Sequence, residues 1–293
     1  MTLIIRGIVM YRFASVFLAF ALTTAFTSGG AVAQEGRLKT IISTKKIKIA
    51  HRVDSVPFSF VNERKQPTGY TVDICKSVVA SLEKQFKVSG IEIQWVPVTS
   101  QSRFDAVAKG QADIECGAST VTLSRMKQVD FSNFVFVEST GVAVMANSGI
   151  NNANDLAGKQ IAVVTGTSNE LAVDALSKRI GMTLVRVNDR AEGIAALEGG
   201  KADAYASDKL LLVGAKFTDP KQIRLLSEDL SIEPHAIVLP RGDTDLRLAV
   251  NTALANIIRS GEITFIFNTW FSSIGLQPGA LISATFLLNA LSD

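Results

Sequence analysis

Short apolar runs alternate with segments of helical apolar spacing along most of this chain. The strand-like runs cover residues 46–51, 92–98, 112–115, 141–145, 160–164, 183–187, 202–206, 223–226 and 236–239. The spacing of amphipathic helices occurs at residues 73–86, 103–109, 168–180, 192–198 and 246–260. This alternation predicts an α/β fold with mainly parallel sheets.

One part of the pattern occurs twice. Residues 106–113 align with residues 196–203 at a constant offset of 90, and each segment reads as a helix end, a glycine and a strand start. The repeat predicts two similarly wound lobes, and the same offset pairs Ser100 with Arg190 and Ala118 with Asp208. Ligands bind beyond the carboxyl ends of strands in open α/β sheets, so these four positions are expected at one cleft. Chance similarity of glycine- and alanine-rich helix ends is the alternative.

The first 33 residues have the features of an export signal. Arg6 and Arg12 precede an apolar, acid-free run at residues 16–26, and residues 31–33 read Ala-Val-Ala, as at a signal-peptidase site. A membrane anchor is the alternative, but the run has about 11 strongly apolar residues where a span needs about 20. We therefore expect a signal peptide at residues 1–33 and a periplasmic mature protein; Met1 and Met10 are both compatible starts.

Composition narrows the class of protein further. The chain has 293 residues, 47% hydrophobic and 19% charged, which excludes a disordered chain. Its 30 Lys and Arg against 27 Asp and Glu give a net charge of +3, which does not suggest a nucleic-acid partner. Removal of residues 1–33 takes away two arginines and no acid, so the mature chain of about 260 residues is nearly neutral. That length favours two lobes.

Patterns typical of enzymes and metal sites are scarce. His51 and His235 each lie among apolar strand residues, so both are expected to be structural, and no metal-ligand spacing occurs. Gly166-Thr167-Ser168 separates a strand from a helix without the lysine of a phosphate loop. It offers backbone donors for a small anion such as a carboxylate, and no cofactor is expected.

Four arginines are more informative. Arg52, Arg103, Arg125 and Arg190 each lie at a strand-to-helix junction on the side of the expected cleft. A guanidinium binds a carboxylate through two parallel, charge-assisted hydrogen bonds. Together the four suggest a small ligand with more than one negative group, although a solvated surface arginine is the alternative for each one.

Several blocks of sequence, in order, resemble one known family. They are residues 52–60, 69–74, 99–103, 115–117, 120–125 followed by 130–132, 166–170, and 261–271. The chain is similar to the extracellular solute-binding proteins of amino-acid ABC transporters, family 3, and within them to the glutamate/aspartate-binding group. The resemblance covers about residues 37–271.

The resemblance implies a two-lobed periplasmic-binding-protein fold of type II. Each lobe would be a mainly parallel sheet flanked by helices, with residues 34–142 and 236–293 forming the first lobe and 143–235 the second. Two hinge strands, expected near residues 139–143 and 233–237, would let the lobes close on a free acidic amino acid. The protein would then deliver this ligand to an inner-membrane ABC permease, acting as a monomer and without nucleic acid.

The resemblance also implies a role for each ligand-binding position. Arg125 would clamp the α-carboxylate, helped by backbone donors at Thr120 and at Thr167 or Ser168. The Thr120 hydroxyl, the Ala118 carbonyl and the Asp208 carboxylate would receive the α-ammonium. The side-chain carboxylate would lie among four further residues: Arg52, Ser100, Arg103 and Arg190.

Two positions depart from the pattern of the group. Ala118 stands where serine is common, which keeps only the backbone acceptor. Arg190 stands where histidine is typical, and a permanently charged guanidinium that reaches further favours the shorter aspartate or another dicarboxylic ligand.

Three features leave alternatives open. Cys75 and Cys116 form either a disulfide, which export permits, or two buried thiols. The apolar tail at residues 279–293 either packs on the first lobe or contacts a partner. The same scaffold also supports enzymes of the cyclohexadienyl (arogenate) dehydratase type, and sensory input domains, because fold does not fix function.

Overall fold

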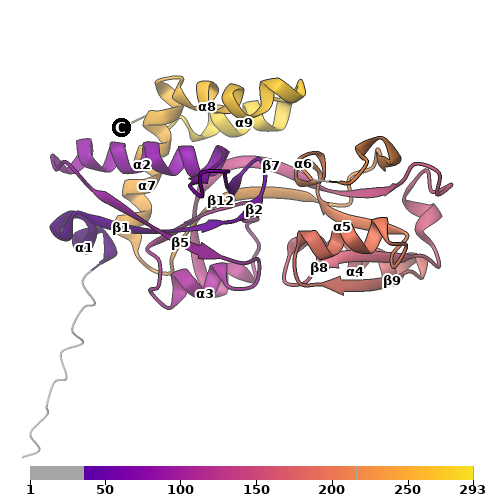
Figure 1. Cartoon of the computed structure of the whole chain (residues 1–293). Coiled ribbons are helices and arrows are strands. Elements are labelled where there is room, and N and C mark those ends of the chain that lie inside the picture. The colour runs from indigo at the N-terminus through magenta and orange to yellow at the C-terminus, as the bar shows by residue number, and fades with distance from the viewer. Residues whose placement is uncertain (1–35, 216, 293) are drawn as a thin grey trace, which may run out of the picture. The chain divides into compact units, whose positions relative to one another are not determined.

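The computed structural model describes residues 36–215 and 217–292, so the expected signal peptide lies outside the described residues. Five strands form the sheet of the first lobe, in the order β5 (Glu92–Val98), β1 (Lys46–Arg52), β6 (Ile114–Cys116), β12 (Ile232–Pro240) and β7 (Val129–Met145) (Figure 1). β1 runs parallel to β5 and β6, and β12 is antiparallel to β6 and β7. The small β2 (Asp54–Ser55), β3 (Ser59–Val61) and β4 (Pro67–Thr68) form a separate antiparallel sheet.

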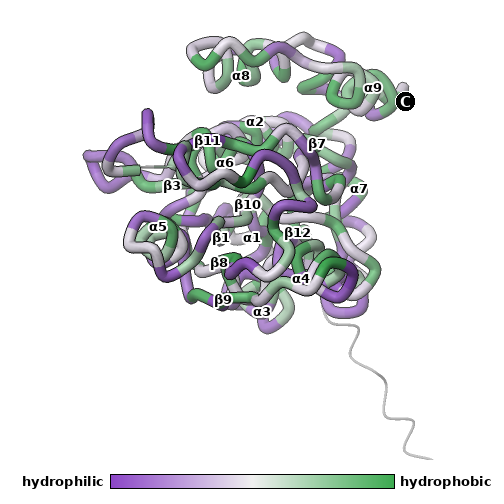
Figure 2. The backbone as a smooth tube through the Cα atoms, turned by 90° about the vertical axis from the view of Figure 1, so that its right-hand side faces the viewer, coloured by the Kyte–Doolittle hydropathy of each residue, from purple (hydrophilic) through white to green (hydrophobic). Residues whose placement is uncertain are grey.

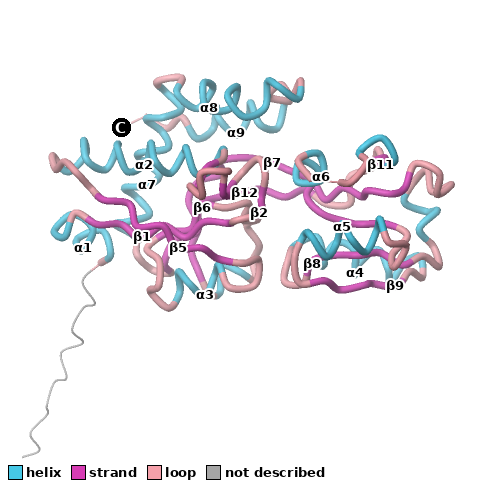
Figure 3. Tube along the Cα trace, in the orientation of Figure 1, coloured by secondary structure: helices cyan, strands magenta, loops and turns pink. Residues whose placement is uncertain are grey.

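Helices cover both faces of the first-lobe sheet. One apolar cluster joins the sheet to α1 (Arg37–Thr44), α2 (Tyr70–Phe86), α7 (Thr244–Arg259), α8 (Glu262–Phe271) and α9 (Ala280–Asn289). A second cluster joins the opposite face to α3 (Arg103–Ala108). Figure 3 shows α2, α8 and α9 on one side of these strands and α3 on the other.

The second lobe repeats this layering on a smaller scale. Its strands follow the order β7, β10 (Ala204–Asp208), β8 (Gln160–Val164) and β9 (Thr183–Val187), and β11 (Ile223–Leu225) pairs with β7. β10, β8 and β9 are parallel. α4 (Ser168–Ile180) packs on one face, and α5 (Arg190–Glu198) and α6 (Lys209–Val213) on the other. The described residues also include the 3-10 turns η1 (Arg125–Lys127), η2 (Ala153–Leu156), η3 (Pro220–Gln222) and η4 (Ser272–Ile274).

β7 connects the two sheets. It pairs with β12 through Ser139 and with β10 from Thr140 onward. This change of partner falls within residues 139–143, where a hinge strand is expected. The opposite residues of β12, near Ile232 and Glu233, border the second expected hinge segment.

The internal repeat has the same local structure in both lobes. After each repeated helix, the strand-start alanine donates its backbone N–H to the carbonyl six residues earlier at 2.9 Å. Each following aspartate accepts from a backbone N–H of the neighbouring strand, at 2.7 and 2.8 Å. The residues are Ala106, Ala112 and Asp113 in one lobe, and Ala196, Ala202 and Asp203 in the other. The repeat therefore reflects equivalent winding and not a chance similarity of composition.

Cys75 and Cys116 form a disulfide, with their Cα atoms 6.4 Å apart. The bond joins α2 to the end of β6, just before the segment at residues 117–120. It thereby fixes the strand end from which that segment enters the cleft.

The apolar tail forms α9 and packs only in part. Ile282 is buried and Phe286 packs against the first-lobe core, whereas Leu281, Leu287 and Leu288 are exposed. Figure 2 colours much of α9 as hydrophobic. Among the described residues, no helix combines the length and the apolar character that a membrane crossing requires.

Candidate functional site

Charged side chains gather where the strands of both lobes end. Arg52 is the last residue of β1, Asp208 is the last residue of β10, and Arg103 is the first residue of α3. Their exposed fractions are 2%, 4% and 3%, so all three are enclosed by protein. Buried charges are costly unless they are paired, so this cluster indicates a site rather than a solvated surface.

Arg125 spans the boundary between the lobes at one end of this site. Its Nη1 donates to the Thr120 carbonyl at 2.7 Å, and its Nη2 donates to the Gly166 carbonyl at 3.3 Å. The guanidinium carbon lies 4.7 Å from the centroid of the Phe104 ring, and that of Arg103 lies 4.8 Å from the same centroid. The phenyl ring thus holds two guanidinium groups through cation–π contacts.

Asp208 forms the acidic pole of the site. Its Oδ1 accepts a hydrogen bond from Asn169 Nδ2 at 2.7 Å, and its Oδ2 lies 3.5 Å from His235 Nε2. Burial alone would raise the pKa of Asp208, but His235 and Asn169 outweigh it and lower that pKa. The carboxylate is therefore ionised at neutral pH and suited to a cationic group.

Arg52 and Arg103 form the opposite, cationic pole. Arg52 Nη2 donates to Asp54 Oδ1 at 2.6 Å, while its Nε and Nη1 are buried without a hydrogen-bond partner among the described residues. Arg103 Nε is likewise buried without a partner. Burial lowers the pKa of Arg52 to about 9 and that of Arg103 to about 10, so both remain protonated at neutral pH. Ser100, 4% exposed, lies beside this pole.

Arg190 reaches from the second lobe to the first. Its Nη1 donates to Ser55 Oγ at 2.7 Å and to the Asp54 carbonyl at 3.1 Å. Its Nε is buried without a partner among the described residues. The long side chain thus closes one side of the cationic pole by contacting the small sheet that contains β2.

Other hydrogen bonds also join the lobes across the cleft. Gln101 Nε2 donates to the carbonyls of Thr165 and Asn188 at 3.1 and 2.9 Å. Ser168 Oγ donates to Thr120 Oγ1 at 3.0 Å. These contacts exclude solvent from the charged groups, so the cleft is closed.

The positions expected from sequence meet at this one cleft. Seven are buried: Arg52, Ser100, Arg103, Ala118, Thr120, Ser168 and Asp208. The others, Arg125, Thr167 and Arg190, are partly buried. Thr167 Oγ1 donates to the Val164 carbonyl at 2.7 Å and accepts from Glu170 N, so this hydroxyl caps α4 and only the backbone of Thr167 is available.

Sequence reasoning missed several residues of the site. Phe104 and Asn169 are the second residues of α3 and α4, directly after positions that were identified. His235 was expected to be structural, and its ring does pack against Phe58, with 5.3 Å between centroids. Its Nε2 nevertheless faces Asp208. Their positions in the sequence could have identified them, because residues next to a helix start or opposite a strand end face the same cleft.

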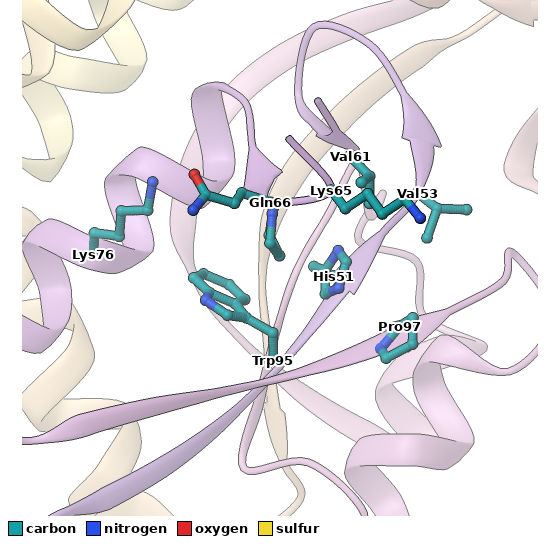
Figure 4. A pocket seen from close by; sticks show the side chains of 9 residues that line it. His51, Val53, Val61, Lys65, Gln66, Lys76, Trp95 and Pro97 are labelled. Atoms are coloured by element: carbon teal, nitrogen blue, oxygen red, sulfur yellow. The ribbon is translucent and has the colours of Figure 1, made fainter. Parts of the chain in front are cut away.

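A separate cavity of about 670 Å³ lies on the first lobe (Figure 4). His51, Trp95 and Pro97 line it together with the side chains of Lys65 and Lys76. His51 packs edge-on against Trp95, with 5.7 Å between centroids, and its Nδ1 lies 3.0 Å from the Arg52 carbonyl, as expected for a structural histidine. No carboxylate lines this cavity, so it lacks the paired acidic and basic poles of the cleft.

Metal ligation does not account for the charged cleft. Within residues 36–215 and 217–292, no three His, Cys, Asp or Glu side chains are grouped so as to hold a metal ion. The arrangement suits the binding of a small molecule that carries both anionic and cationic groups.

Comparisons with known proteins agree with this geometry. Residues 47–273 match the family model of bacterial extracellular solute-binding proteins, family 3. The chain is 33% identical over 268 residues to an L-glutamate/L-aspartate-binding protein of Pseudomonas aeruginosa, covering 89% of each. It is 30% identical over 253 residues to a glutamate/aspartate import solute-binding protein of Salmonella typhimurium, covering 85% of this chain and 84% of that one.

Solved structures show the same fold. An ancestral arginine-binding protein with bound arginine has a TM-score of 0.70 at 25% identity, over 78% of this chain and 98% of that chain. The solute receptor for L-cysteine of Neisseria gonorrhoeae has a TM-score of 0.72 at 22% identity, over 82% and 97% of the two chains.

Proposed function

The chain belongs to the bacterial extracellular solute-binding proteins of family 3, and on that premise we propose that it captures aspartate or glutamate for import. Its fold is the two-lobed, type II fold of periplasmic amino-acid-binding proteins. It acts as the substrate-binding component of an ABC importer, and the curated relatives named above are binding proteins rather than enzymes. The family implies a periplasmic location. In the proposal, residues 1–33 direct export and the mature protein is a monomer.

The enclosure of three arginines and one aspartate in a single cleft carries this proposal. Arg125 balances the α-carboxylate of the ligand, and Asp208 balances the α-ammonium. Arg52 and Arg103 balance a second carboxylate. The buried guanidinium nitrogens without partners support this assignment, because an unsatisfied buried polar group costs about 1 to 3 kcal/mol, and more if charged.

The remaining expected positions complete the ligand shell in this proposal. Thr120 contributes its hydroxyl and its backbone N–H, and Ala118 contributes its carbonyl. Ser168 or Thr167 supplies a backbone donor at the start of α4, where a helix N-terminus favours an anion. Ser100 and Arg190 border the side-chain carboxylate.

Arg190 favours the shorter ligand. Its Nη1 is held by Ser55 and by the Asp54 carbonyl, so the guanidinium lies across the cationic pole. A side chain of this length and permanent charge leaves less depth than the histidine typical of the group. We therefore expect aspartate to bind at least as tightly as glutamate.

Closure of the two lobes around the ligand distinguishes the bound protein from the free protein. Groups of both lobes contact the ligand together only when the cleft is shut, so the ligand shifts an open–closed equilibrium toward the closed form. The permease would recognise that form. The hinge is expected where β7 changes its partner at Ser139 and Thr140. A small-angle scattering profile that stays unchanged at saturating ligand would contradict this mechanism.

The ligand itself is the most direct test. Mass spectrometry of amino acids that copurify with the protein should recover aspartate or glutamate. Calorimetric titration of the stripped protein should then give at least tenfold weaker binding of glutamine, which has the size of glutamate without its side-chain charge. Equal affinities for glutamine and glutamate would refute the side-chain assignment, and recovery of a basic or aliphatic amino acid would refute the ligand class.

The dehydratase alternative has less support. An ancestral amino-acid-binding precursor of cyclohexadienyl dehydratase shares the fold, with a TM-score of 0.70 at 24% identity, which bears on fold alone. Such chemistry requires an acid or base that faces the substrate. In the proposal Asp208 is occupied by the ligand ammonium and the other charged groups around the ligand are arginines, so incubation with prephenate or arogenate should yield no aromatic product.

A further inference from the structure

Glu115 is a buried acid directly behind the cationic pole. It lies in β6, opposite Ala50 of β1 and Val238 of β12, and its exposed fraction is 0%. Register partners point to the same face of a sheet, and Ala50 and Val238 belong to the apolar cluster that packs against α3. The carboxylate therefore enters the layer between the sheet and the helix that begins with Arg103.

The carboxylate of Glu115 has no fixed donor. Neither oxygen forms a hydrogen bond of good geometry among the described residues, and the buried hydroxyl of Ser119, which has no other partner, is the neutral donor beside it. A Cβ atom on Gly117 would lie 2.1 Å from Glu115 Oε1 and 3.1 Å from Arg52 Cγ. The carboxylate thus occupies the space above a glycine, beside the stem of a ligand-facing arginine.

Three cations balance the charge of this carboxylate. Arg52 acts on it from β1, Arg103 from α3 and Arg125 from η1, while β12 presents apolar Val238 and Ala236. Burial raises the pKa of Glu115, and the charge of Arg103 above all, followed by the Ser119 hydroxyl and the other two arginines, opposes the shift. Among the described residues Arg103 forms no ion pair within 4 Å, and Glu115, followed by Asp208, is the acidic group that favours its charged form.

We propose that Glu115 is a positioning residue that balances Arg103 and Arg52 while the cleft is empty and takes up a proton when a ligand carboxylate binds them. The inference rests on the proposed function, because it requires an anionic ligand at this pole. The proton comes from the solvent and converts the Glu115 carboxylate to the neutral acid.

Competition for the same cations is the physical reason. A ligand carboxylate brings a second negative charge to guanidinium groups that Glu115 already shares. Two buried carboxylates near one another do not both remain ionised at low cost. In the proposal the ligand receives direct hydrogen bonds from the arginines, whereas Glu115 has no hydrogen bond from an arginine, so Glu115 is the one that becomes neutral.

This coupling has a definite sign. The ligand makes protonation of Glu115 easier, and by linkage protonation of Glu115 makes ligand binding tighter by the same factor. Affinity is therefore highest at the acidic end of the titration of Glu115 and falls as the pH rises through it. A glutamine at position 115 removes the dependence and should bind aspartate about tenfold more tightly than the native chain at the alkaline end.

A buried acid near Asp208 must be separated from this effect. Glu138 of β7 is near Asp208, and burial together with that charge raises the pKa of Glu138 to about 8. An ammonium group bound at Asp208 would favour the ionised form of Glu138 and release a proton. The uptake at Glu115 is therefore measured in a Glu138→Gln background.

Calorimetry in buffers of different ionisation enthalpy measures the protons exchanged. The Glu138→Gln protein is titrated with L-aspartate across a series of pH values, and the slope of the observed enthalpy against buffer enthalpy gives the proton number. We expect uptake in Glu138→Gln and none in Glu138→Gln/Glu115→Gln, whose affinity should not change with pH. A control that removes the exposed Glu63 in place of Glu115 should retain the uptake.

The outcomes are distinct. Absence of proton uptake by Glu138→Gln at every pH would overturn the inference, as would the same uptake in the double variant. The first of these results requires no substitution at position 115, so the test holds even if Glu115→Gln fails to fold. If neither aspartate nor glutamate binds the native chain, the proposed function is wrong. If either one binds without proton uptake at Glu115, the proposed function stands and the inference about Glu115 is wrong.

Discussion

Replacement of Glu138 by glutamine should make the stability of the protein less dependent on pH. Glu138 lies on β7 just before the change of partner, and it is 8% exposed. Burial first, and then the negative charge of Asp208, raises its pKa from 4.5 to about 8. Its Oε1 accepts a hydrogen bond from Ser139 N at 3.0 Å, a contact that a glutamine carbonyl can keep.

The sign follows from proton linkage. Between about pH 4.5 and pH 8 the folded state holds a proton on Glu138 that the unfolded state has lost. The free energy of unfolding of the native chain therefore falls as the pH rises through this window. Each pKa unit corresponds to about 1.4 kcal/mol, so the full shift sets a ceiling of about 5 kcal/mol; water penetration and relaxation reduce the expected effect to about 2 to 4 kcal/mol.

Urea denaturation followed by tryptophan fluorescence, at several pH values, tests this. The free energy of unfolding of Glu138→Gln, minus that of the native chain, should rise by up to about 1.4 kcal/mol per pH unit between about pH 4.5 and 8. Outside that range the difference should level off. Glu63→Gln, which removes the same charge from an exposed position, should show no such trend. A Glu138→Gln difference that is flat, or that falls with rising pH, would refute the reasoning.

Three further substitutions test other parts of the structure. Arg125→Lys should weaken aspartate binding by about ten- to a hundredfold in calorimetry, because two parallel hydrogen bonds become one, whereas exposed Arg247→Lys should bind as the native chain does. Joint replacement of Cys75 and Cys116 by alanine removes a disulfide between residues that are 41 positions apart in the sequence. It should lower the free energy of unfolding by about 2 to 4 kcal/mol, and a urea midpoint equal to that of the native chain would contradict this. Gly193→Ala should reduce the melting temperature, because its Cβ would lie 2.3 Å from a buried tyrosine ring; an unchanged midpoint would show that the ring gives way.

Local pattern was sufficient for most of the elements. The expected segments 92–98, 160–164, 183–187 and 168–180 coincide with β5, β8, β9 and α4, because each has a continuous apolar or helical pattern between clear breaks. Two strands were predicted too short. β7 begins at Val129 and β12 at Ile232, but the parts before residues 141 and 236 contain polar residues such as Ser132, Glu138 and Glu233. These residues belong to the two strands that connect the lobes, and hydrogen bonds such as Ile237 N to Ser132 Oγ and Thr140 Oγ1 to Glu233 Oε1 accommodate polar side chains that interrupt the apolar pattern.

The internal repeat predicts the position of the cleft from the sequence alone. Ser100, Ala118, Arg190 and Asp208 were placed together by one offset, and the structure has all four at the strand ends of the two lobes. The repeat gave no sign of Glu115, because a single acid inside a short strand has the same appearance as any other strand residue. Its meaning depends on Arg52 and Arg103, which approach it from different elements.

Closure and charge are linked in this cleft through the buried arginines. With the lobes joined at Gln101, Arg125 and Arg190, nitrogens of Arg52 and Arg103 are removed from water without protein acceptors. In an open cleft the same nitrogens would be hydrated, so the penalty of burying them opposes closure. A ligand carboxylate that accepts from them removes this penalty only in the closed form. At a hundredfold excess over its dissociation constant, a ligand specific for the closed form stabilises it by about 2.7 kcal/mol. The arginines thus disfavour closure without an anion and favour it with one, which makes the closed form a reliable signal of an acidic ligand.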